Sequence, residues 1–145
     1  MVQRVLESAD EVPGLARLLQ HREFPVTVNV RKGRPRSDKS NRLQQLWHKE
    51  AAEQIGDETA EEKRGYFKLT IGVPILRAED EEFREAYDSH VKSLPYETKL
   101  AVMQEPIDFP CTRRMTSRMH KQALDELWDH YRSVGVELTS PEDLR

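Results

Sequence analysis

The stretch Phe24-Pro-Val-Thr-Val-Asn-Val-Arg31 decides the fold class that the sequence predicts. Val26, Val28 and Val30 alternate with polar residues, which is the period-2 pattern of a strand with one buried face. Residues 2–6 are also apolar enough to form a short strand. We therefore expect an α+β fold in which a short N-terminal β unit precedes a mostly helical part.

Helical patterns lie on both sides of the predicted strand. Before it, residues 11–21 carry leucines at helical spacing, and Pro13 falls in the first turn, where a proline is tolerated. After it, residues 43–55 repeat apolar side chains every three or four positions, and Gly56 is well placed to end that helix. Both patterns predict amphipathic helices.

Further helix starts are marked by side chains that can accept hydrogen bonds from backbone N–H groups, namely Thr59, Asp80 and either Thr112 or Thr116. Glu62 completes a capping box with Thr59, and we expect Gly72 and Pro74 to end the helix that this box begins. In the next helix His90 lies on the apolar face, which predicts a buried core histidine. Gly135 is expected to end the last helix.

Length and composition limit the class of protein. The 145 residues suit a single domain, so we expect one domain over residues 1–145. No apolar run approaches the roughly 20 residues of a membrane helix, and the first residues lack the apolar core of a signal peptide. The single cysteine, Cys111, offers neither an internal disulfide nor a zinc-ligand spacing. These features predict a cytoplasmic protein with no metal or other cofactor.

The formal net charge of −3 conceals two cationic segments around an acidic middle. The first cationic segment, residues 31–42, holds six basic residues and one acidic residue. The second, residues 111–121, holds four basic residues and no acidic one, whereas residues 43–110 hold eight basic and fifteen acidic residues. Each segment can attract a polyanion locally, because salt screens charges beyond about 8 Å. Solvated loops are the alternative interpretation of such runs.

Both cationic segments lead into predicted helix starts, where unpaired N–H groups and the helix dipole already favour an anion. Basic side chains there reach phosphates without reading base identity. We therefore predict salt-sensitive DNA binding by Arg34, Arg36, Lys39, Arg42, Arg113, Arg114, Arg118 and Lys121.

Three further residues are candidates for contacts with DNA. Asn41 and Ser117 could donate neutral hydrogen bonds to phosphate or sugar, and helix capping is the alternative role of such residues. Trp47 lies just inside the first helix after the cationic loop, where it could stack on the bases of a single strand. Its helical spacing favours packing in the core as the alternative.

The sequence contains no pattern that is typical of catalysis, such as a Walker A loop, a Rossmann glycine pattern or a nucleophile elbow. We therefore expect a binding protein and not an enzyme. The acidic clusters at residues 57–62 and 79–82 leave a metal-dependent nuclease or resolvase as an alternative. A module that binds an acidic protein partner through the cationic segments is a third interpretation.

Two short motifs resemble the phage NinB family. Arg36-Ser-Asp-Lys-Ser-Asn-Arg-Leu-Gln-Gln-Leu-Trp47, which follows the valine-rich stretch, resembles the Arg-Ser-x-x-Gln-Asn-Arg-x-x-Trp type pattern of that family, with Ser40 in place of glutamine. Thr116-Ser-Arg-Met119 precedes an amphipathic helix that ends near Gly135, as a second motif does in the family. The motifs keep their order and approximate separation, and the resemblance extends over residues 26–135.

The resemblance implies a homodimeric α+β protein of the bacterial cytoplasm that binds DNA and prefers single strands. It also implies that the protein helps to load a recombinase onto strands coated by single-strand-binding protein. The matched positions are Arg36, Asn41, Arg42, Trp47, Ser117 and Arg118. The additional basic charge of residues 31–39 predicts that duplex DNA binds as well. We expect a homodimer whose paired cationic segments line one DNA-binding surface.

Overall fold

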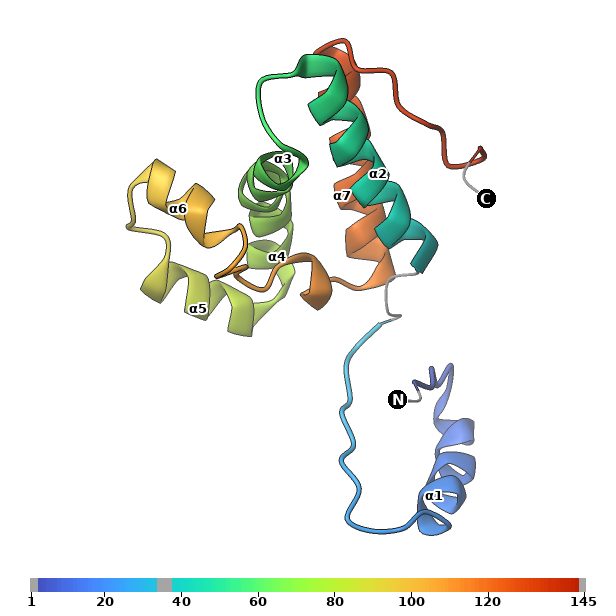
Figure 1. The fold of residues 1–145 in the computed structure, drawn as a ribbon. Coiled ribbons are helices and arrows are strands. Elements are labelled where there is room, and N and C mark those ends of the chain that lie inside the picture. The colour runs from blue at the N-terminus through green and yellow to red at the C-terminus, as the bar shows by residue number, and fades with distance from the viewer. Residues whose placement is uncertain (1–2, 34–37, 144–145) are drawn as a thin grey trace. The chain divides into compact units, whose positions relative to one another are not determined.

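The computed structural model describes residues 3–33 and 38–143, and its contacts divide the chain into two compact units, residues 1–34 and residues 35–145. The N-terminal unit contains a 3-10 turn, η1 (Ala9–Glu11), and helix α1 (Val12–Gln20). The other helices belong to the C-terminal unit (Figure 1). The described core side chains lie between Leu43 and Val136, so the C-terminal unit supplies them all. One domain over residues 1–145 stays a prediction.

The predicted N-terminal β unit is wrong, and with it the α+β fold class. No β-sheet forms in residues 3–33 or 38–143, and residues 26–31 have no regular secondary structure. An alternating pattern forms a strand only where a neighbouring strand pairs with its N–H and C=O groups. The described part of the chain supplies no such neighbour, and Val28 and Val30 are 53% and 91% exposed. The regular structure of both units is helical.

The helix predicted for residues 11–21 is confirmed as α1, with Pro13 in its first turn, although none of its side chains is buried. The helix predicted after the cationic loop is confirmed as α2 (Asp38–Ile55). It ends at Gly56, whose φ of 77° lies in the left-handed region that favours glycine.

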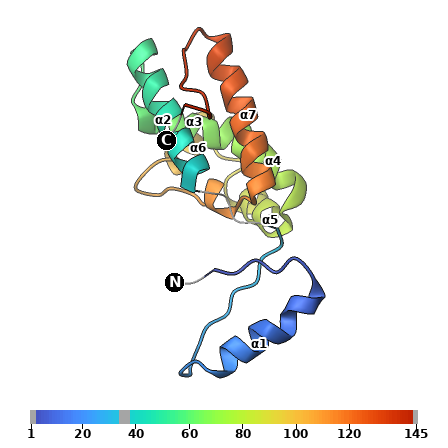
Figure 2. The same ribbon diagram turned by 90° about the vertical axis from the view of Figure 1, so that its right-hand side faces the viewer.

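Helix α7 (Ser117–Ser133) runs parallel to α2, side by side with it, so that both helices begin at the same end of the C-terminal unit (Figures 1 and 2). Its start confirms the predicted cap, because the Thr116 hydroxyl accepts a hydrogen bond from the Met119 N–H at 3.3 Å. The parallel arrangement brings together two helix starts that are almost 80 residues apart in the sequence.

A continuous helical column packs against α2 and α7. It consists of α3 (Ala60–Phe67), the π-helical turn η2 (Lys68–Gly72) and α4 (Val73–Glu79). The capping box at its start is confirmed, with both hydrogen bonds between Thr59 and Glu62 at 3.1 Å. The predicted helix end before Gly72 and Pro74 is wrong. The wider π turn precedes the proline, which therefore falls in the first turn of α4, where its missing N–H is tolerated.

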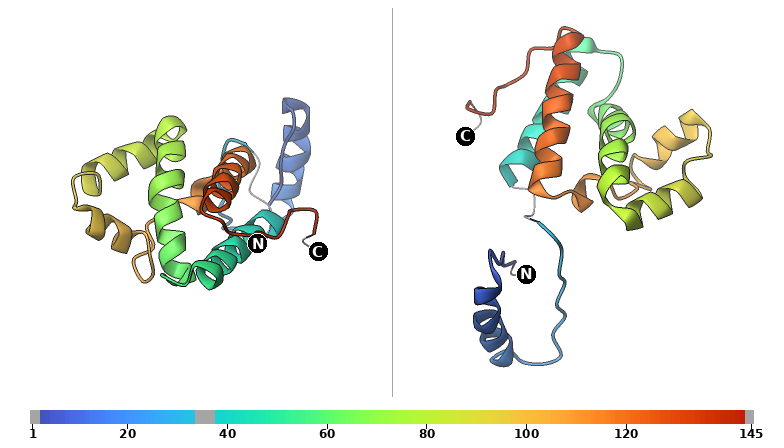
Figure 3. Two further views of the ribbon diagram at one scale, coloured as in Figure 1. Left: turned by 90° about the horizontal axis from the view of Figure 1, so that it is seen from above. Right: turned by 180° about the vertical axis from the view of Figure 1, so that it is seen from behind.

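Two shorter helices lie on the side of this column that faces away from α2 and α7 (Figures 1 and 3). They are α5 (Glu81–His90) and α6 (Tyr96–Val102), and the 3-10 turn η3 (Thr112–Arg114) leads back to α7. Asp80 caps α5 as predicted, by accepting from the Phe83 N–H at 3.0 Å. His90 is exposed, contrary to the prediction of a core histidine. No helix of the described residues combines the length and apolar character that crossing a membrane requires.

Gly72 allows the column and the segment before α7 to approach closely. A β-carbon on Gly72 would lie 2.5 Å from the Cys111 Sγ atom and 3.4 Å from the Met115 Cε atom. Cys111 is itself buried, and its thiol donates to the Lys68 carbonyl at 3.8 Å. A side chain at this position therefore has no space without movement of the core.

We expect Gly72→Ala to lower the free energy of unfolding by about 1–3 kcal/mol, because the added methyl group overpacks the core. Chemical denaturation monitored by circular dichroism measures this change. In the double variant Gly72→Ala, Cys111→Ala the sulfur atom is gone, so the penalty for the glycine substitution should shrink relative to the Cys111→Ala single variant. A penalty that is the same in both backgrounds would show that the contact with Cys111 is not its cause.

Candidate nucleic-acid interface

A buried hydrogen bond joins α2 and α7 close to their starts. The Gln44 Oε1 atom lies 2.7 Å from the His120 Nε2 atom, and both side chains are buried. Gln44 belongs to the second turn of α2, and His120 lies at the end of the first turn of α7. The start of α2, which holds the last residues of the first cationic segment, and the second cationic segment therefore lie at one end of the C-terminal unit (Figure 2).

The first cationic segment supplies two exposed basic side chains to this end. Lys39 and Arg42 are exposed in the first two turns of α2, and Asn41 between them is half-buried. Arg34 and Arg36, which we also predicted to bind DNA, lie outside the described residues.

The second cationic segment supplies three more. Arg113 is exposed in η3, and Arg118 and Lys121 are exposed in the first two turns of α7. Ser117 is half-buried at the first position of α7. We call the five exposed basic residues at the starts of α2 and α7 the cationic end: Lys39, Arg42, Arg113, Arg118 and Lys121.

Arg114 has a different environment from the other predicted DNA-binding arginines. Its Nε and Nη2 atoms donate to the two carboxylate oxygens of Asp80 at 2.9 and 3.1 Å. Asp80 also caps α5, so this fork-shaped ion pair ties η3 to the start of that helix. The hydrogen bond to Asp80 raises the pKa of Arg114. Arg114 therefore stabilises the fold, and we leave it out of the cationic end.

The ion pairs of Arg118 and Lys121 are more exposed. A single nitrogen of Arg118, Nη2, lies 2.6 Å from both carboxylate oxygens of Glu79. Lys121 pairs with Asp125 one turn further along α7, at 3.2 Å. The side chains of Arg118 and Lys121 are 66% and 79% exposed, and pairs of this kind contribute little to stability. Arg118 and Lys121 can therefore leave their carboxylate partners for another anion at little cost in stability.

Trp47 is a core residue in the structure. It is 2% exposed, and its indole N–H donates to the Thr139 carbonyl at 2.7 Å. Its ring packs against Trp128 with a centroid separation of 5.2 Å. The face that base stacking would need is therefore covered, and the arrangement fits the alternative of core packing.

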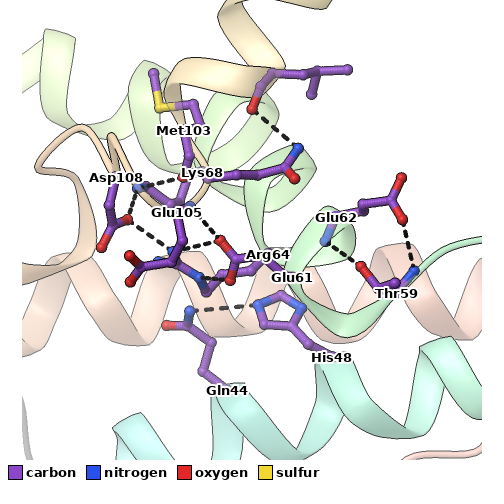
Figure 4. Close-up of polar contacts among 12 residues, drawn as sticks. Gln44, His48, Thr59, Glu61, Glu62, Arg64, Lys68, Met103, Glu105 and Asp108 are labelled. Atoms are coloured by element: carbon purple, nitrogen blue, oxygen red, sulfur yellow. Dashed lines mark hydrogen bonds and ion pairs between the residues drawn. The ribbon is translucent and has the colours of Figure 1, made fainter.

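A chain of buried polar groups continues from Gln44 along the contact between α2 and α7. The Gln44 amide nitrogen lies 3.4 Å from His48 Nε2 (Figure 4). On the other side of the ring, His48 Nδ1 lies 2.8 Å from the Tyr131 hydroxyl. An amide nitrogen donates, so His48 accepts at Nε2 and carries its proton on Nδ1. Sequence reasoning missed this network. His48 and His120 each stand three or four residues from apolar side chains of the same helix. This spacing is the signal that could have indicated their burial.

Acidic residues of the clusters that suggested a metal-dependent nuclease form ion pairs with basic side chains. Lys63 contacts Asp57 and Glu58 at 3.0 and 3.2 Å, and Arg64 contacts Glu61 at 2.9 Å. Within residues 3–33 and 38–143, no three His, Cys, Asp or Glu side chains form a group that could hold a metal ion.

The column is joined to the loop after α6 by a second buried cluster that sequence reasoning also missed (Figure 4). Lys68, which is 1% exposed, donates to the Met103 carbonyl at 2.7 Å and to Asp108 at 2.6 Å. Arg64 reaches the same Asp108 oxygen at 2.8 Å. Burial lowers the pKa of Lys68, and the hydrogen bond to Asp108 opposes this shift. The cluster holds α6 and its loop against the column.

Comparison with known proteins finds no family model, curated protein or solved structure that matches the chain.

Burial makes His48 a determinant of stability in acid. Desolvation, assisted by the positive charge of Arg64, lowers its pKa from 6.5 to about 3. The unfolded chain therefore binds a proton at this residue between pH 6.5 and 3, whereas the folded chain does not. The stabilisation is complete above pH 6.5 and is lost as the pH falls toward 3, at up to about 1.4 kcal/mol per pH unit.

We expect His48→Asn to flatten the dependence of unfolding free energy on pH between 6.5 and 5, because the amide does not titrate. Urea denaturation at closely spaced pH values measures the two slopes. The exposed residue His90 provides the matched control, and His90→Asn should keep the slope of the original protein. Equal slopes for His48→Asn and the original protein would contradict the assignment.

Proposed function

We propose that the C-terminal unit binds DNA through the cationic end, by contacts with the phosphate backbone and without bond chemistry. The observation that supports this proposal is the parallel packing of α2 and α7, which gathers exposed basic residues of both cationic segments around two helix starts. Backbone N–H groups at helix starts favour anions, and Lys and Arg side chains add phosphate contacts.

The placement of the charges supports a role in binding more than a role in folding. Lys39 and Arg118 are each the second residue of their helix. A positive charge in the first turn opposes the helix dipole and costs about 0.3–1 kcal/mol at an exposed site. A phosphate group at the same place is favoured by the dipole and by the basic side chain together. Binding of a polyanion therefore compensates for a charge distribution that is unfavourable in the free protein.

Contacts of this kind bind single strands and duplexes alike, because they do not read the bases. With Trp47 in the core, the preference for single strands rests on the resemblance to the NinB family. The narrower role in loading a recombinase onto strands coated by single-strand-binding protein rests on the same two motifs. Both are part of the proposal, as is action in the bacterial cytoplasm.

We expect Arg42→Ala and Arg118→Ala each to weaken DNA binding about equally for different sequences. Each change should also flatten the slope of log affinity against log salt concentration, by about 0.7 for a single strand and 0.9 for a duplex. Fluorescence anisotropy with a labelled oligonucleotide and its duplex at several salt concentrations measures both quantities. Lys92→Ala, an exposed change just after α5, is the matched control and should leave the slope unchanged.

Two results would count against the proposal. The first is the absence of binding to either form of DNA at low salt. The second is a loss of affinity in Lys92→Ala as large as in the variants of the cationic end, because the binding would then depend on total charge and not on this surface. Incubation of single strands, forks and junctions with Mg²⁺ or Mn²⁺ tests the nuclease alternative directly, since cleavage products would replace simple binding.

A homodimer is part of the same proposal, and exposed apolar side chains in the N-terminal unit support it. Val28 and Val30 are 53% and 91% exposed. Apolar side chains that are exposed close together are typical of a surface that contacts another protein. We expect light scattering to give the mass of two chains, and Val28→Asp to shift the mass toward one chain. Val134, which is also 53% exposed, provides the control, since Val134→Asp should keep the dimer. The mass of one chain at all micromolar concentrations would exclude the dimer.

A further inference from the structure

Two neighbouring acidic residues at the junction of α4 and α5 bind the two arginines that flank the start of α7. Asp80 binds Arg114, and Glu79 binds Arg118. The partners are 34 and 39 residues apart in the sequence, so the fold brings them together. The cationic end therefore includes an arginine that already has a carboxylate partner in the free protein.

The two ion pairs differ in their hydrogen bonds and in their exposure to solvent. Arg114 uses two nitrogens on two oxygens of Asp80, a carboxylate that also caps α5. Arg118 uses one nitrogen, its side chain is 66% exposed, and the Glu79 side chain makes no other hydrogen bond within the described residues. Loss of the first pair would disturb a helix start. Loss of the second leaves both side chains in solvent with the backbone unchanged.

The helix dipoles favour exchange of the second pair. Arg118 is a positive charge in the first turn of α7, and Glu79 is a negative charge at the last position of α4. Each charge therefore lies at the end of its own helix where the dipole disfavours it. The two side chains compensate each other in the free protein, and a phosphate at the start of α7 would replace Glu79 with a group of the same charge.

We propose that Glu79 is an internal competitor for the DNA phosphate at Arg118. It occupies the guanidinium group in the free protein, and DNA displaces it on binding. This inference rests on the proposed function and adds that an acidic side chain of the chain itself sets the affinity. A phosphate backbone competes effectively with Glu79 because it contacts the other basic residues of the cationic end at the same time.

The test is a double-mutant cycle with Glu79→Gln and Arg118→Ala, read by anisotropy of a labelled single strand over a range of salt concentrations. Glu85→Gln is the matched control, because it removes the same charge from an exposed position on α5. We expect Glu79→Gln to tighten binding about two- to fivefold more than Glu85→Gln, as an exposed ion pair permits. Arg118 contacts phosphate in both complexes, so Glu79→Gln should change the salt slope much less than the roughly 0.7 that loss of this contact causes.

In the Arg118→Ala background, the gain from Glu79→Gln should fall to that of Glu85→Gln. A gain that persists without Arg118, or equals that of the control, overturns the inference while the proposed function stands. Failure of every variant to bind DNA at low salt overturns the proposed function and the inference together. Thermal unfolding of each variant confirms that it is folded, which the exposure of both side chains leads us to expect.

Discussion

The buried hydrogen bonds between α2 and α7 are the constraint on which the arrangement of the cationic end depends. Apolar side chains alone would let two parallel helices slide by a turn at small cost. Gln44, His48, His120 and Tyr131 have fixed donors and acceptors, so a shift in register would leave polar groups unpaired in the core, at about 1–3 kcal/mol for each group. The network thus fixes which residues of the two helix starts lie side by side.

This fixed register has an electrostatic consequence. Two helix dipoles with their positive ends together repel each other, and the basic residues Lys39 and Arg118 add to the positive potential. Hydrogen bonds and packing deeper in the C-terminal unit have to hold this end together against that repulsion. A positive potential at the surface attracts a polyanion. Because the packed interior holds the basic residues in place before the partner binds, less free energy is lost in ordering them on binding.

Local patterns predicted the helix boundaries well, because capping is decided within a few residues. The capping box at Thr59, the cap at Asp80 and the glycine at Gly56 all act on neighbouring N–H or C=O groups. The strand at residues 24–31 was wrong because a strand depends on a partner that a local pattern does not contain. The break at Gly72 was wrong because Gly72 serves a distant contact with Cys111, which only the packed core reveals.

The candidate site shows the same limit at the level of single arginines. Charge and helix position made Arg114 and Arg118 equivalent in the sequence, since both lie in the cationic segment before or within the first turn of α7. Their roles differ because of Asp80 and Glu79, two acids in a segment that looked like an ordinary helix start. Arg114 is held by Asp80, a carboxylate that also caps α5, so breaking this ion pair would disturb the start of α5. Arg118 is held by a carboxylate that caps no helix, and this difference is the reason why we propose Arg118, and not Arg114, as a phosphate contact.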